Sequence, residues 1–427
     1  MDTNYFDMVD VAILGGGAAG LSAARVTAQA GLTTALIERD ASLGGILNQC
    51  IHNGFGLHYF GAELTGPEYA GRVAERALDA GCLAFPGTTV TDLSVVPASG
   101  GHPPLKKIRC CSAEHGVMEI LARAVVLAMG SRERNRGNLA IGGNRPAGVF
   151  TAGTAQRLMN IHGYLPGREA VIIGSGDIGL IMARRLTWCG VSVKGVVEIM
   201  PYPAGLPRNL AQCLEDFNIP LHLNCQTLRI NGRDRVESVD VAPRENGTPN
   251  LDKQFRIPCD TVLMAVGLVP ENELSTKAGV KLDPATGGPA VDARLMTNLD
   301  GVFACGNVLH IHDLVDYVSE EAEAVAGHVI EYLGGVGKAA ELKTVPRQNL
   351  RYVIPGGADP QADNAFFMRP TIVTDNARLT VCQGNRVIYS RPLKYVRPAE
   401  MLKIQLPQAA LKDADRTAAL EFSLLAG

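Results

Sequence analysis

Two copies of one glycine pattern, far apart in the chain, constrain the fold more than any other feature. Residues 10–14 read as a short buried strand and lead directly into Gly15-Gly16-Gly17-Ala18-Ala19-Gly20, a G-x-G-x-x-G turn. Residues 21–30 have helical composition, and the strand expected at 34–37 ends in Glu38. This order predicts a β-α-β unit whose glycine turn opens the helix.

The positions of these glycines indicate a dinucleotide site. Gly15 permits the turn, Gly17 lets a pyrophosphate approach the backbone, and Gly20 lets the helix pack closely on the strand. The N-terminus of the helix attracts phosphate, and an acid at the end of the second strand can accept hydrogen bonds from ribose hydroxyls. We therefore expect binding at the following residues: Gly15, Gly17, Ala18, Ala19, Gly20, Glu38 and Arg39.

The second copy begins at Glu169. An apolar strand at 170–173 leads into Gly174-Ser175-Gly176-Asp177-Ile178-Gly179, a helix is expected at 180–189, and a strand at 191–197 ends in Glu198. The chain is therefore expected to bind two dinucleotides. Glu198 favours NAD over NADP, because a carboxylate repels a 2′-phosphate and no arginine cluster follows it.

The composition is that of a globular protein with more than one domain. The chain has 427 residues, of which 46% are hydrophobic and 19% charged, and its formal net charge is -3. That charge gives no electrostatic footprint for nucleic acid or for an anionic membrane. No uncharged apolar run reaches the roughly 18 residues of a membrane span, and no signal peptide is recognisable. We expect a cytoplasmic protein.

The ten cysteines are scattered, and no C-x-x-C occurs. Such spacing predicts buried thiols rather than disulfides, zinc fingers or iron–sulfur sites. Adjacent Cys110 and Cys111 are also expected to be thiols, because a bridge between neighbours is strained.

With both glycine patterns placed, residues 8 to about 335 resemble the two-dinucleotide-binding-domain flavoproteins, the superfamily of glutathione reductase, thioredoxin reductase and ferredoxin reductases. The likeness also rests on Leu43-Gly44-Gly45 and on three later runs at 125–130, 262–270 and 297–307. It implies an α/β fold with two Rossmann-like domains, the NAD domain inserted in the FAD domain, plus a small, mostly β C-terminal domain. Asn307 stands where the family usually has an acid.

The resemblance implies FAD and NAD as cofactors and adds residues to both sites. The added FAD residues are Gly44, Gly45, Gln49, Val90, Met129, Gly130, Gly306, Asn307 and Val315. The NAD residues are Gly174, Ser175, Gly176, Asp177, Ile178, Gly179, Glu198, Val266 and Gly267. The expected FAD domain is 1–148 with 275–340, the NAD domain 149–274 and the β domain 341–427. A helix at 315–333 is expected to point its N-terminus at the flavin.

The disulfide branch of the superfamily is excluded. The second and seventh residues after the Gly-Gly pair, where that branch has its redox cysteines, are Leu47 and His52, and Cys50 lies between them with no second cysteine at either spacing. Hydride transfer between nicotinamide and flavin needs no protein acid or base. The sequence therefore identifies no catalytic side chain. The candidates for residues close to the flavin ring are His52, Cys50 and His312.

Two short sequence segments resemble particular groups of proteins within this superfamily. Residues 145–157 are similar to the FAD/NAD subunits of opine and nopaline oxidases, hydrogen cyanide synthase and sarcosine oxidase, and residues 45–56 to flavoproteins found with anaerobic glycerol-3-phosphate-type dehydrogenases. This implies an electron-transfer subunit of a dehydrogenase complex acting on a 2-hydroxy acid, an amine or opine, or a glycerol 3-phosphate-like substrate. The implied partner is a second flavin dehydrogenase subunit, with or without an iron–sulfur subunit. A self-sufficient NADH:acceptor oxidoreductase and a non-catalytic assembly subunit remain as alternatives.

Three further segments carry weaker expectations. Residues 341–427 contain short β-leaning runs at 349–354, 371–374, 379–382 and 386–390, and an interface role is favoured there. His310-Ile-His312-Asp313 has metal-like spacing but lacks a distant ligand, so we expect no metal and a solvated or substrate-facing loop. Glu320, Glu321 and Glu323 are expected to form a solvated helix face.

Overall fold

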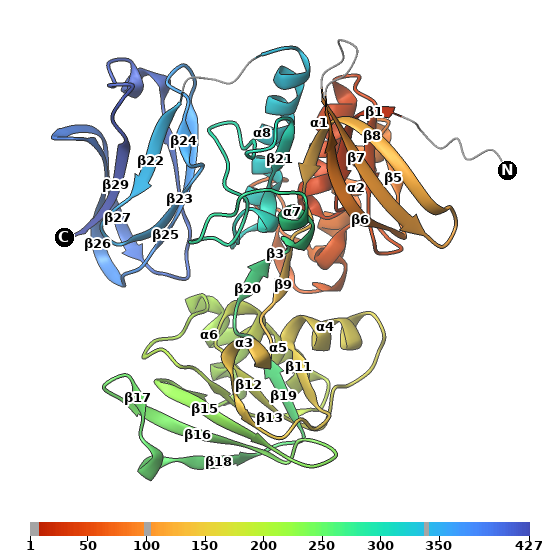
Figure 1. Cartoon of the computed structure of the whole chain (residues 1–427). Helices are drawn as coiled ribbons and strands as arrows, with labels where there is room; N and C mark the ends of the chain where they lie inside the picture. Colours follow the sequence, from red (N-terminus) through yellow and green to blue (C-terminus); the bar gives the residue numbers. More distant parts are fainter. Residues whose placement is uncertain (1–7, 98–103, 337–340) are drawn as a thin grey trace. The chain divides into compact units, whose positions relative to one another are not determined.

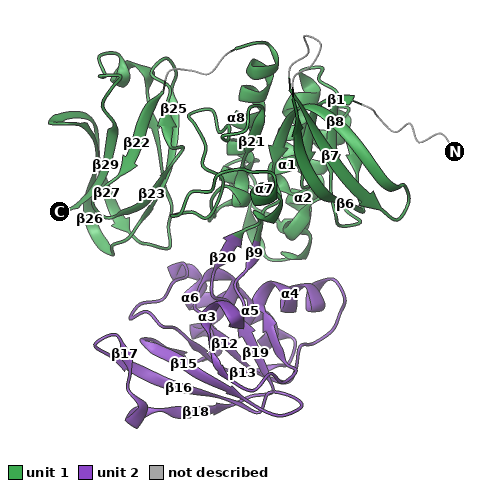
Figure 2. Cartoon of the chain, in the orientation of Figure 1, with its two compact units in different colours: residues 1–131, 270–427 green, residues 132–269 purple. Residues whose placement is uncertain are grey.

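The computed structural model describes residues 8–97, 104–336 and 341–427, and Figure 2 shows the chain divided into two units. Unit 1 comprises 1–131 and 270–427, and unit 2 comprises 132–269. The sequence placed the boundaries at 148/149 and 274/275 instead. Residues 132–148 group with unit 2 because they include β10 (Gly142–Gly143), which pairs with β15 (Cys225–Asn231) of that unit.

Unit 1 is built on a seven-stranded sheet of order β5-β2-β1-β8-β7-β6, with β21 added to β8 (Figure 1). Its strands are β1 (Met8–Leu14), β2 (Thr34–Ile37), β5 (Leu83–Phe85), β6 (Thr88–Val96), β7 (Leu105–Ser112), β8 (Gly116–Leu127) and β21 (Val302–Ala304). The strands β5, β2, β1, β8 and β21 pair in parallel, whereas β6, β7 and β8 pair antiparallel. The parallel strands are buried along most of their length, as expected of a sheet covered on both faces.

The helices of unit 1 are α1 (Ala18–Gln29), α2 (Gly66–Asp79), α7 (Glu273–Lys277) and α8 (Val315–Leu333). Short elements complete this part: η1 (Gly45–Gln49), β3 (Asn53–Phe55), β4 (Leu64–Thr65) and η4 (Gly306–Val308). None of the helices that the structure describes is both long and apolar enough to cross a bilayer.

Strand β8 is the hub of unit 1. Its first part pairs with β7, and its end pairs with β1 on one side and with β21 on the other. The chain leaves the sheet after β8, builds all of unit 2, and then returns through β21 to complete it. Unit 2 is therefore an insertion into unit 1.

Residues 341–427 form strands, as the sequence predicts. The strands are β22 (Leu342–Pro346), β23 (Leu350–Ile354), β24 (Gly357–Ala358), β25 (Asn364–Pro370), β26 (Thr374–Gln383), β27 (Arg386–Val396), β28 (Leu402–Leu406) and β29 (Leu420–Ala426), with η5 at Gln408–Leu411. They make a five-stranded sheet, β24-β22-β29-β26-β27, and a three-stranded one, β23-β25-β28. The prediction of a strand at 371–374 is wrong: β25 ends at Pro370, which cannot donate a ladder hydrogen bond, and β26 begins at Thr374.

This C-terminal part packs on the segment that precedes and begins α8. The guanidinium of Arg369 donates to both oxygens of Asp313, at 2.9 Å each. Lys403 forms an ion pair with Glu320, and the Phe367 ring lies against the His310 ring with centroids 5.3 Å apart. The β part of unit 1 is thus anchored by charge and by ring packing next to the start of α8.

Unit 2 has two five-stranded sheets. The first, of order β11-β19-β12-β13-β14, is parallel and consists of β11 (Val149–Thr151), β19 (Thr261–Met264), β12 (Glu169–Ile173), β13 (Ser192–Val197) and β14 (Leu221–His222). The second contains β10, β15, β16 (Ser238–Glu245), β17 (Thr248–Pro249) and β18 (Phe255–Pro258). Its helices are α3 (Arg136–Leu139), α4 (Ala152–Asn160), α5 (Asp177–Trp188), α6 (Pro207–Cys213), η2 (Glu215–Phe217) and η3 (Leu251–Lys253). Paired strands β9 (Ser131–Glu133) and β20 (Leu268–Pro270) carry the chain in and out.

The predicted fold class is confirmed. The first β-α-β unit is β1-α1-β2 and the second is β12-α5-β13, each with its glycine turn between the first strand and the helix. The helix predicted at 315–333 is α8, with the same bounds.

Candidate functional site

The glycine turn of unit 1 has the local geometry that its residue types predict. Gly15 has φ +109°, and a Cβ at Gly15 would overlap the carbonyl of Ala128. A Cβ at Gly20 would overlap the carbonyl oxygen of Gly15, because α1 packs tightly on the turn. A Cβ at Gly17 would meet no protein atom within 4 Å. The open side of the turn is therefore at Gly17, at the N-terminus of α1.

Helix α1 begins without a capping side chain: Gly17 is the N-cap and makes no side-chain hydrogen bond. The first backbone N–H groups of a helix have no partner within the helix, so this end can bind an anion. The Glu38 carboxylate accepts a hydrogen bond from Gly16 N at 2.6 Å and one from Asp40 N at 2.7 Å. The acid at the end of β2 is thus fixed against the turn.

The other predicted FAD motifs meet at the same turn. Gly44 N donates to Gly16 O at 2.8 Å, and a Cβ at Gly45 would lie 3.1 Å from the Gly17 Cα. A Cβ at Gly306, which has φ +73°, would lie 2.9 Å from the Cβ of Ala19. Segments far apart in the chain are therefore brought against one glycine turn.

The remaining predicted residues of this site lie around these contacts. Met129 and Gly130 follow β8, and the Met129 Cα lies next to Gly15. Gln49 is buried at the end of η1, and Arg39 is exposed after Glu38. Val90 lies on β6, two residues after Thr88, whose N–H donates to Glu38 O. Ala18 is the first residue of α1, Asn307 lies in η4 and Val315 begins α8.

Unit 2 repeats this geometry. Gly174 has φ +97°, and its Cβ would overlap the carbonyl of Ala265, the residue before predicted Val266 and Gly267. A Cβ at Gly179 would lie 2.7 Å from Gly174 O, whereas a Cβ at Gly176 would meet no protein atom within 4 Å. Helix α5 also begins on a glycine, Gly176, without a side-chain cap. The two turns are locally equivalent.

The acid of the second turn is held more extensively than the first. Glu198 is buried, and its Oε2 accepts from Ser175 N at 2.9 Å and from Ser175 Oγ at 2.7 Å. Its Oε1 accepts from Met200 N at 2.9 Å. Asp177 accepts from Leu206 N and Asn209 Nδ2, so this predicted NAD residue also ties α6 to the start of α5. Ile178 is half-buried in the first turn of α5.

Cys50 and His52 follow η1, next to the Gly-Gly motif. All ten cysteines are free thiols, as the sequence predicts. Burial raises the pKa of the Cys50 thiol to about 12, which keeps it protonated and unreactive at neutral pH. The His52 ring packs on Phe55 with centroids 5.0 Å apart.

The expectation of a solvated 310–312 loop is wrong, and so is that of a fully solvated Glu320–Glu323 face. His310, His312 and Glu321 are at most 8% exposed and form one cluster. Glu321 Oε2 lies 2.8 Å from His310 Nε2, and Glu321 Oε1 lies 3.2 Å from His312 Nε2. The cause is tertiary: rings of Tyr352 and Phe367, from the C-terminal strands, cover the imidazoles.

The neighbouring acids of α8 are also paired. Glu323 forms an ion pair with Arg25 at 2.6 Å and accepts from the Tyr59 hydroxyl. Glu320 pairs with Lys403. Asn307 Oδ1 accepts from His312 N at 3.0 Å, so the buried cluster is connected to the late FAD motif.

Sequence reasoning missed Asp316. This residue of the first turn of α8 is 3% exposed, and its two oxygens accept from Gly56 N at 3.0 Å and His58 N at 3.1 Å. The position of Asp316 at the start of a predicted helix was the one sequence signal for this residue. Its hydrogen-bond partners lie about 260 residues earlier in the chain, and no sequence pattern predicts such distant contacts.

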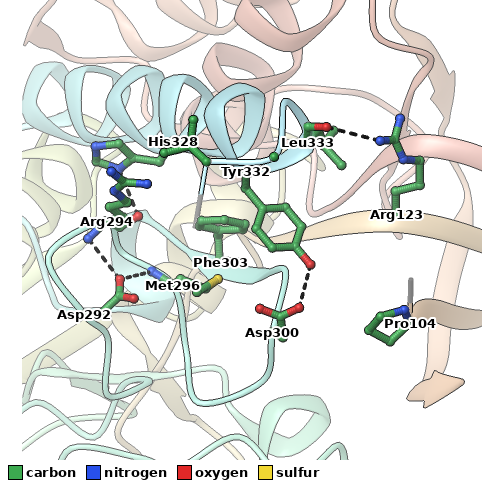
Figure 3. Close-up of a pocket in the computed structure, with 12 residues that line it drawn as sticks. Pro104, Arg123, Asp292, Arg294, Met296, Asp300, Phe303, His328, Tyr332 and Leu333 are labelled. Carbon is green, nitrogen blue, oxygen red and sulfur yellow. Dashed lines mark hydrogen bonds between the residues drawn. The ribbon is translucent and has the colours of Figure 1, made fainter. Parts of the chain in front are cut away.

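A pocket of about 330 Å³ lies elsewhere in unit 1, beside the C-terminal end of α8 (Figure 3). Its polar groups are bonded within the protein: Asp292 accepts from Arg294 N and Met296 N, and Tyr332 donates to Asp300 at 2.8 Å. No residue of the predicted FAD or NAD motifs lines this pocket in the part of the chain that the structure describes. It is therefore separate from both predicted cofactor sites.

Comparison with known proteins gives a family match over residues 9–325, to the pyridine nucleotide-disulphide oxidoreductases. An opine oxidase subunit from Agrobacterium tumefaciens is 24% identical over 81% of this chain and 68% of its own length. Hydrogen cyanide synthase subunit HcnB of Pseudomonas protegens is 26% identical over 63% of this chain, and the match spans only 58% of that protein.

The fold itself matches solved structures. A crystal structure of thioredoxin reductase from T. acidophilum superposes with a TM-score of 0.61 at 24% identity, covering 78% of this chain and 100% of that one. This likeness covers the architecture of two dinucleotide-binding domains.

Proposed function

This chain belongs to the pyridine nucleotide-disulphide oxidoreductase family of FAD-dependent enzymes, and we propose that it binds FAD in unit 1, binds NAD in unit 2 and supports hydride transfer between them. The observation that carries the proposal is the pair of equivalent glycine turns, each open at the middle glycine and each closed by an acid. When bound, the flavin supplies the redox chemistry.

The residues present fit an FAD. Gly17 leaves room for a pyrophosphate at the uncapped start of α1, and the Glu38 carboxylate, fixed against the same turn, would accept hydrogen bonds from the ribose. The Gly44-Gly45 and Gly306 backbones close on the same turn. The chain's own contribution is to bind and orient the cofactor with backbone groups.

The residues of unit 2 fit a nicotinamide dinucleotide, and Glu198 favours NAD over NADP. Its fixed carboxylate would repel the 2′-phosphate of NADP and would accept hydrogen bonds from the ribose hydroxyls of NAD. No cysteine pair is available as a redox disulfide among the ten, all of which lie in the described part of the chain, so electrons must enter or leave through the flavin itself.

We further propose that the chain is one subunit of a dehydrogenase complex acting on a 2-hydroxy acid, an amine or opine, or a glycerol 3-phosphate-like substrate. The support is that two relatives are subunits of named enzymes, opine oxidase and hydrogen cyanide synthase. Residues 341–427 remain our candidate for the partner interface. One face of this part is already occupied by the α8 segment, so the docking face must be another.

A matched pair of glycine variants tests the two sites. Gly17→Val should give a folded but colourless protein, because a Cβ at this position meets no protein atom within 4 Å and the side chain would occupy the space proposed for the pyrophosphate. Gly176→Val should remain yellow but no longer be bleached by NADH. Flavin absorbance and anaerobic NADH titration measure both.

Gly71→Val is the control, since a Cβ at this glycine of α2 also meets no atom within 4 Å and Gly71 belongs to neither turn. The control should keep both colour and bleaching. A yellow Gly17→Val protein would count against the FAD assignment, and NADH bleaching of Gly176→Val at the normal rate would count against the NAD assignment.

The subunit proposal is tested by purification from the native host. A second flavoprotein or an iron–sulfur chain should co-purify in fixed ratio, and oxidation of the organic substrate should require it. Oxidation of such a substrate by this chain alone, at ordinary enzymatic rates, would favour the self-sufficient alternative instead.

A further inference from the structure

We propose that two buried carboxylates of α8, Asp316 and Glu321, hold the bound flavin at a low reduction potential and so favour electron flow from flavin to NAD⁺. This inference rests on the proposed FAD site in unit 1. It concerns the direction of the reaction, which the cofactor motifs leave open. Both carboxylates bond directly to backbone of the segments that form the site.

Asp316 is bonded as a carboxylate. One oxygen accepts from Gly56 N and the other from His58 N, so neither is placed as the hydroxyl of a carboxylic acid. Gly56 and His58 belong to the segment that follows the Gly44-Gly45 motif. A helix N-terminus is equivalent to about +0.5 charge. One ionised carboxylate in the first turn therefore outweighs the helix dipole of α8.

Glu321 is bonded in the same way, further along the same helix. Its Oε1 accepts from Gly306 N at 2.7 Å, and both imidazole Nε2 atoms approach its oxygens. Burial alone would raise the pKa of the Glu321 carboxyl, but His312, His310 and their hydrogen bonds lower it well below its ordinary range. Burial lowers the pKa of the His310 imidazole, which keeps that ring neutral.

The tautomers of the two histidines separate this arrangement from a metal site. His310 Nδ1 and His312 Nδ1 are buried without a hydrogen-bond partner among the described residues. A metal on Nε2 would place a proton on each Nδ1, and within the described chain neither Nδ1 has the acceptor that normally orients a metal-bound histidine. With the protons on Nε2, both rings donate to Glu321 instead. The cluster is then an anion held by three N–H groups.

Among the described residues, neither carboxylate forms an ion pair with a lysine or an arginine. The nearby basic side chains are each engaged by another acid: Lys403 with Glu320, Arg369 with Asp313, and Arg25 with Glu323. Burial raises the pKa of the Cys305 thiol, and the negative charge of Glu321 raises it further.

The consequence follows from charge. A reduced flavin carries more negative charge than an oxidised one, and charges interact strongly in a buried, low-dielectric setting. Two buried carboxylates without a lysine or arginine partner in the described chain, bonded to the segments of the site, therefore disfavour reduction. Transfer in the favoured direction moves one hydride, two electrons with one proton, from the reduced flavin to the nicotinamide ring. The electrons would come from an alcohol or amine substrate oxidised by the partner subunit.

The experiment is a redox titration of the FAD-loaded full chain. The midpoint potential of the bound flavin should lie below that of free FAD in the same buffer. At equal NAD⁺ and NADH most of the flavin should stay oxidised. Asp316→Asn and Glu321→Gln should each shift the potential to more positive values, while keeping one hydrogen-bond acceptor, and the double variant should shift it further.

Glu320→Gln is the matched control, because it removes the same charge from the neighbouring residue of the same helix, where the side chain is 36% exposed and solvent screens its charge. Its potential should equal that of the unmodified chain. A potential at or above that of the NAD⁺/NADH couple, or shifts no larger than the control, would overturn the proposal. So would one equivalent of tightly bound metal in the purified protein that Glu321→Gln removes. Failure to bind FAD at all would instead refute the proposed function.

Discussion

Each glycine turn is closed by a carboxylate that lies 22 or 23 residues after the backbone N–H it accepts from. Glu38 accepts from Gly16 N, and Glu198 accepts from Ser175 N. A hydrogen bond to a charged group is worth about 1.5–3 kcal/mol. The acids thus shape the turns, and in the proposed sites they would also present oxygen atoms to a ribose.

Glu198 should decide between the two nicotinamide dinucleotides. In the unmodified chain we expect flavin reduction to be much faster with NADH than with NADPH. Glu198→Ala should weaken NADH use about ten- to a hundredfold, which corresponds to the loss of one charged hydrogen bond. Stopped-flow bleaching with each nucleotide measures this. Equal rates with both nucleotides in the unmodified chain would contradict the assignment.

Residue-scale prediction from sequence succeeded where the cause is local. Gly15 and Gly174 adopt positive φ because the strand-to-helix turn requires this backbone conformation. The glycine pattern that predicts the turn lies within a few consecutive residues. It failed at Glu321, whose place in a charged run on a helix resembles a solvated face. The burial of Glu321 depends on His310 and His312, and on the Phe367 ring that covers them, which no local pattern connects to the helix.

At the scale of elements, α2 shows how a cap supports the site. Thr65 is its N-cap, and the Glu68 carboxylate accepts from both Thr65 N and Thr65 Oγ1 at 2.8 Å in a capping box. The next residue, Gly66, donates from its backbone N to Cys50 O at 2.8 Å. The start of α2 therefore holds the segment that follows the Gly-Gly motif.

Thr65→Ala should destabilise unit 1 by about 1 kcal/mol, the usual cost of losing an N-cap side chain. Hydrogen exchange should become faster at the first-turn amides of α2 and at the 45–50 segment. Thr151→Ala, which removes the N-cap of α4 in unit 2, is the control and should leave exchange in α2 unchanged. Unchanged exchange of α2 in the Thr65 variant would show that the cap contributes nothing.

On the scale of the whole molecule, we expect the buried thiols to lower the free energy of unfolding at alkaline pH. Burial raises the pKa of the Cys50, Cys110 and Cys259 thiols to about 12, against an ordinary value near 9. Above about pH 9 the unfolded chain loses these protons while the folded chain keeps them, so the free energy of unfolding falls as pH rises. Lys106, whose pKa burial lowers to about 8, acts in the opposite direction but is a single group.

Two adjacent cysteines of β7 test this. Cys110→Ala should make the fall in unfolding free energy between about pH 9 and 12 shallower, because Cys110 is fully buried. Cys111→Ala should leave the slope unchanged, because Cys111 is exposed. Urea denaturation in reducing buffer at several pH values gives both slopes. Equal slopes for the two variants would refute the explanation.

The insertion of unit 2 between β8 and β21 sets the order in which the protein can be completed during synthesis. When β8 leaves the ribosome, the strand that will pair with its end has not yet been made, and the whole of unit 2 comes first. Unit 2 is one continuous stretch of chain and can fold in that interval. The nascent sheet of unit 1 meanwhile has an open, apolar edge, which invites pairing with other chains. We expect that interval to be the stage at which newly made protein depends most on chaperones.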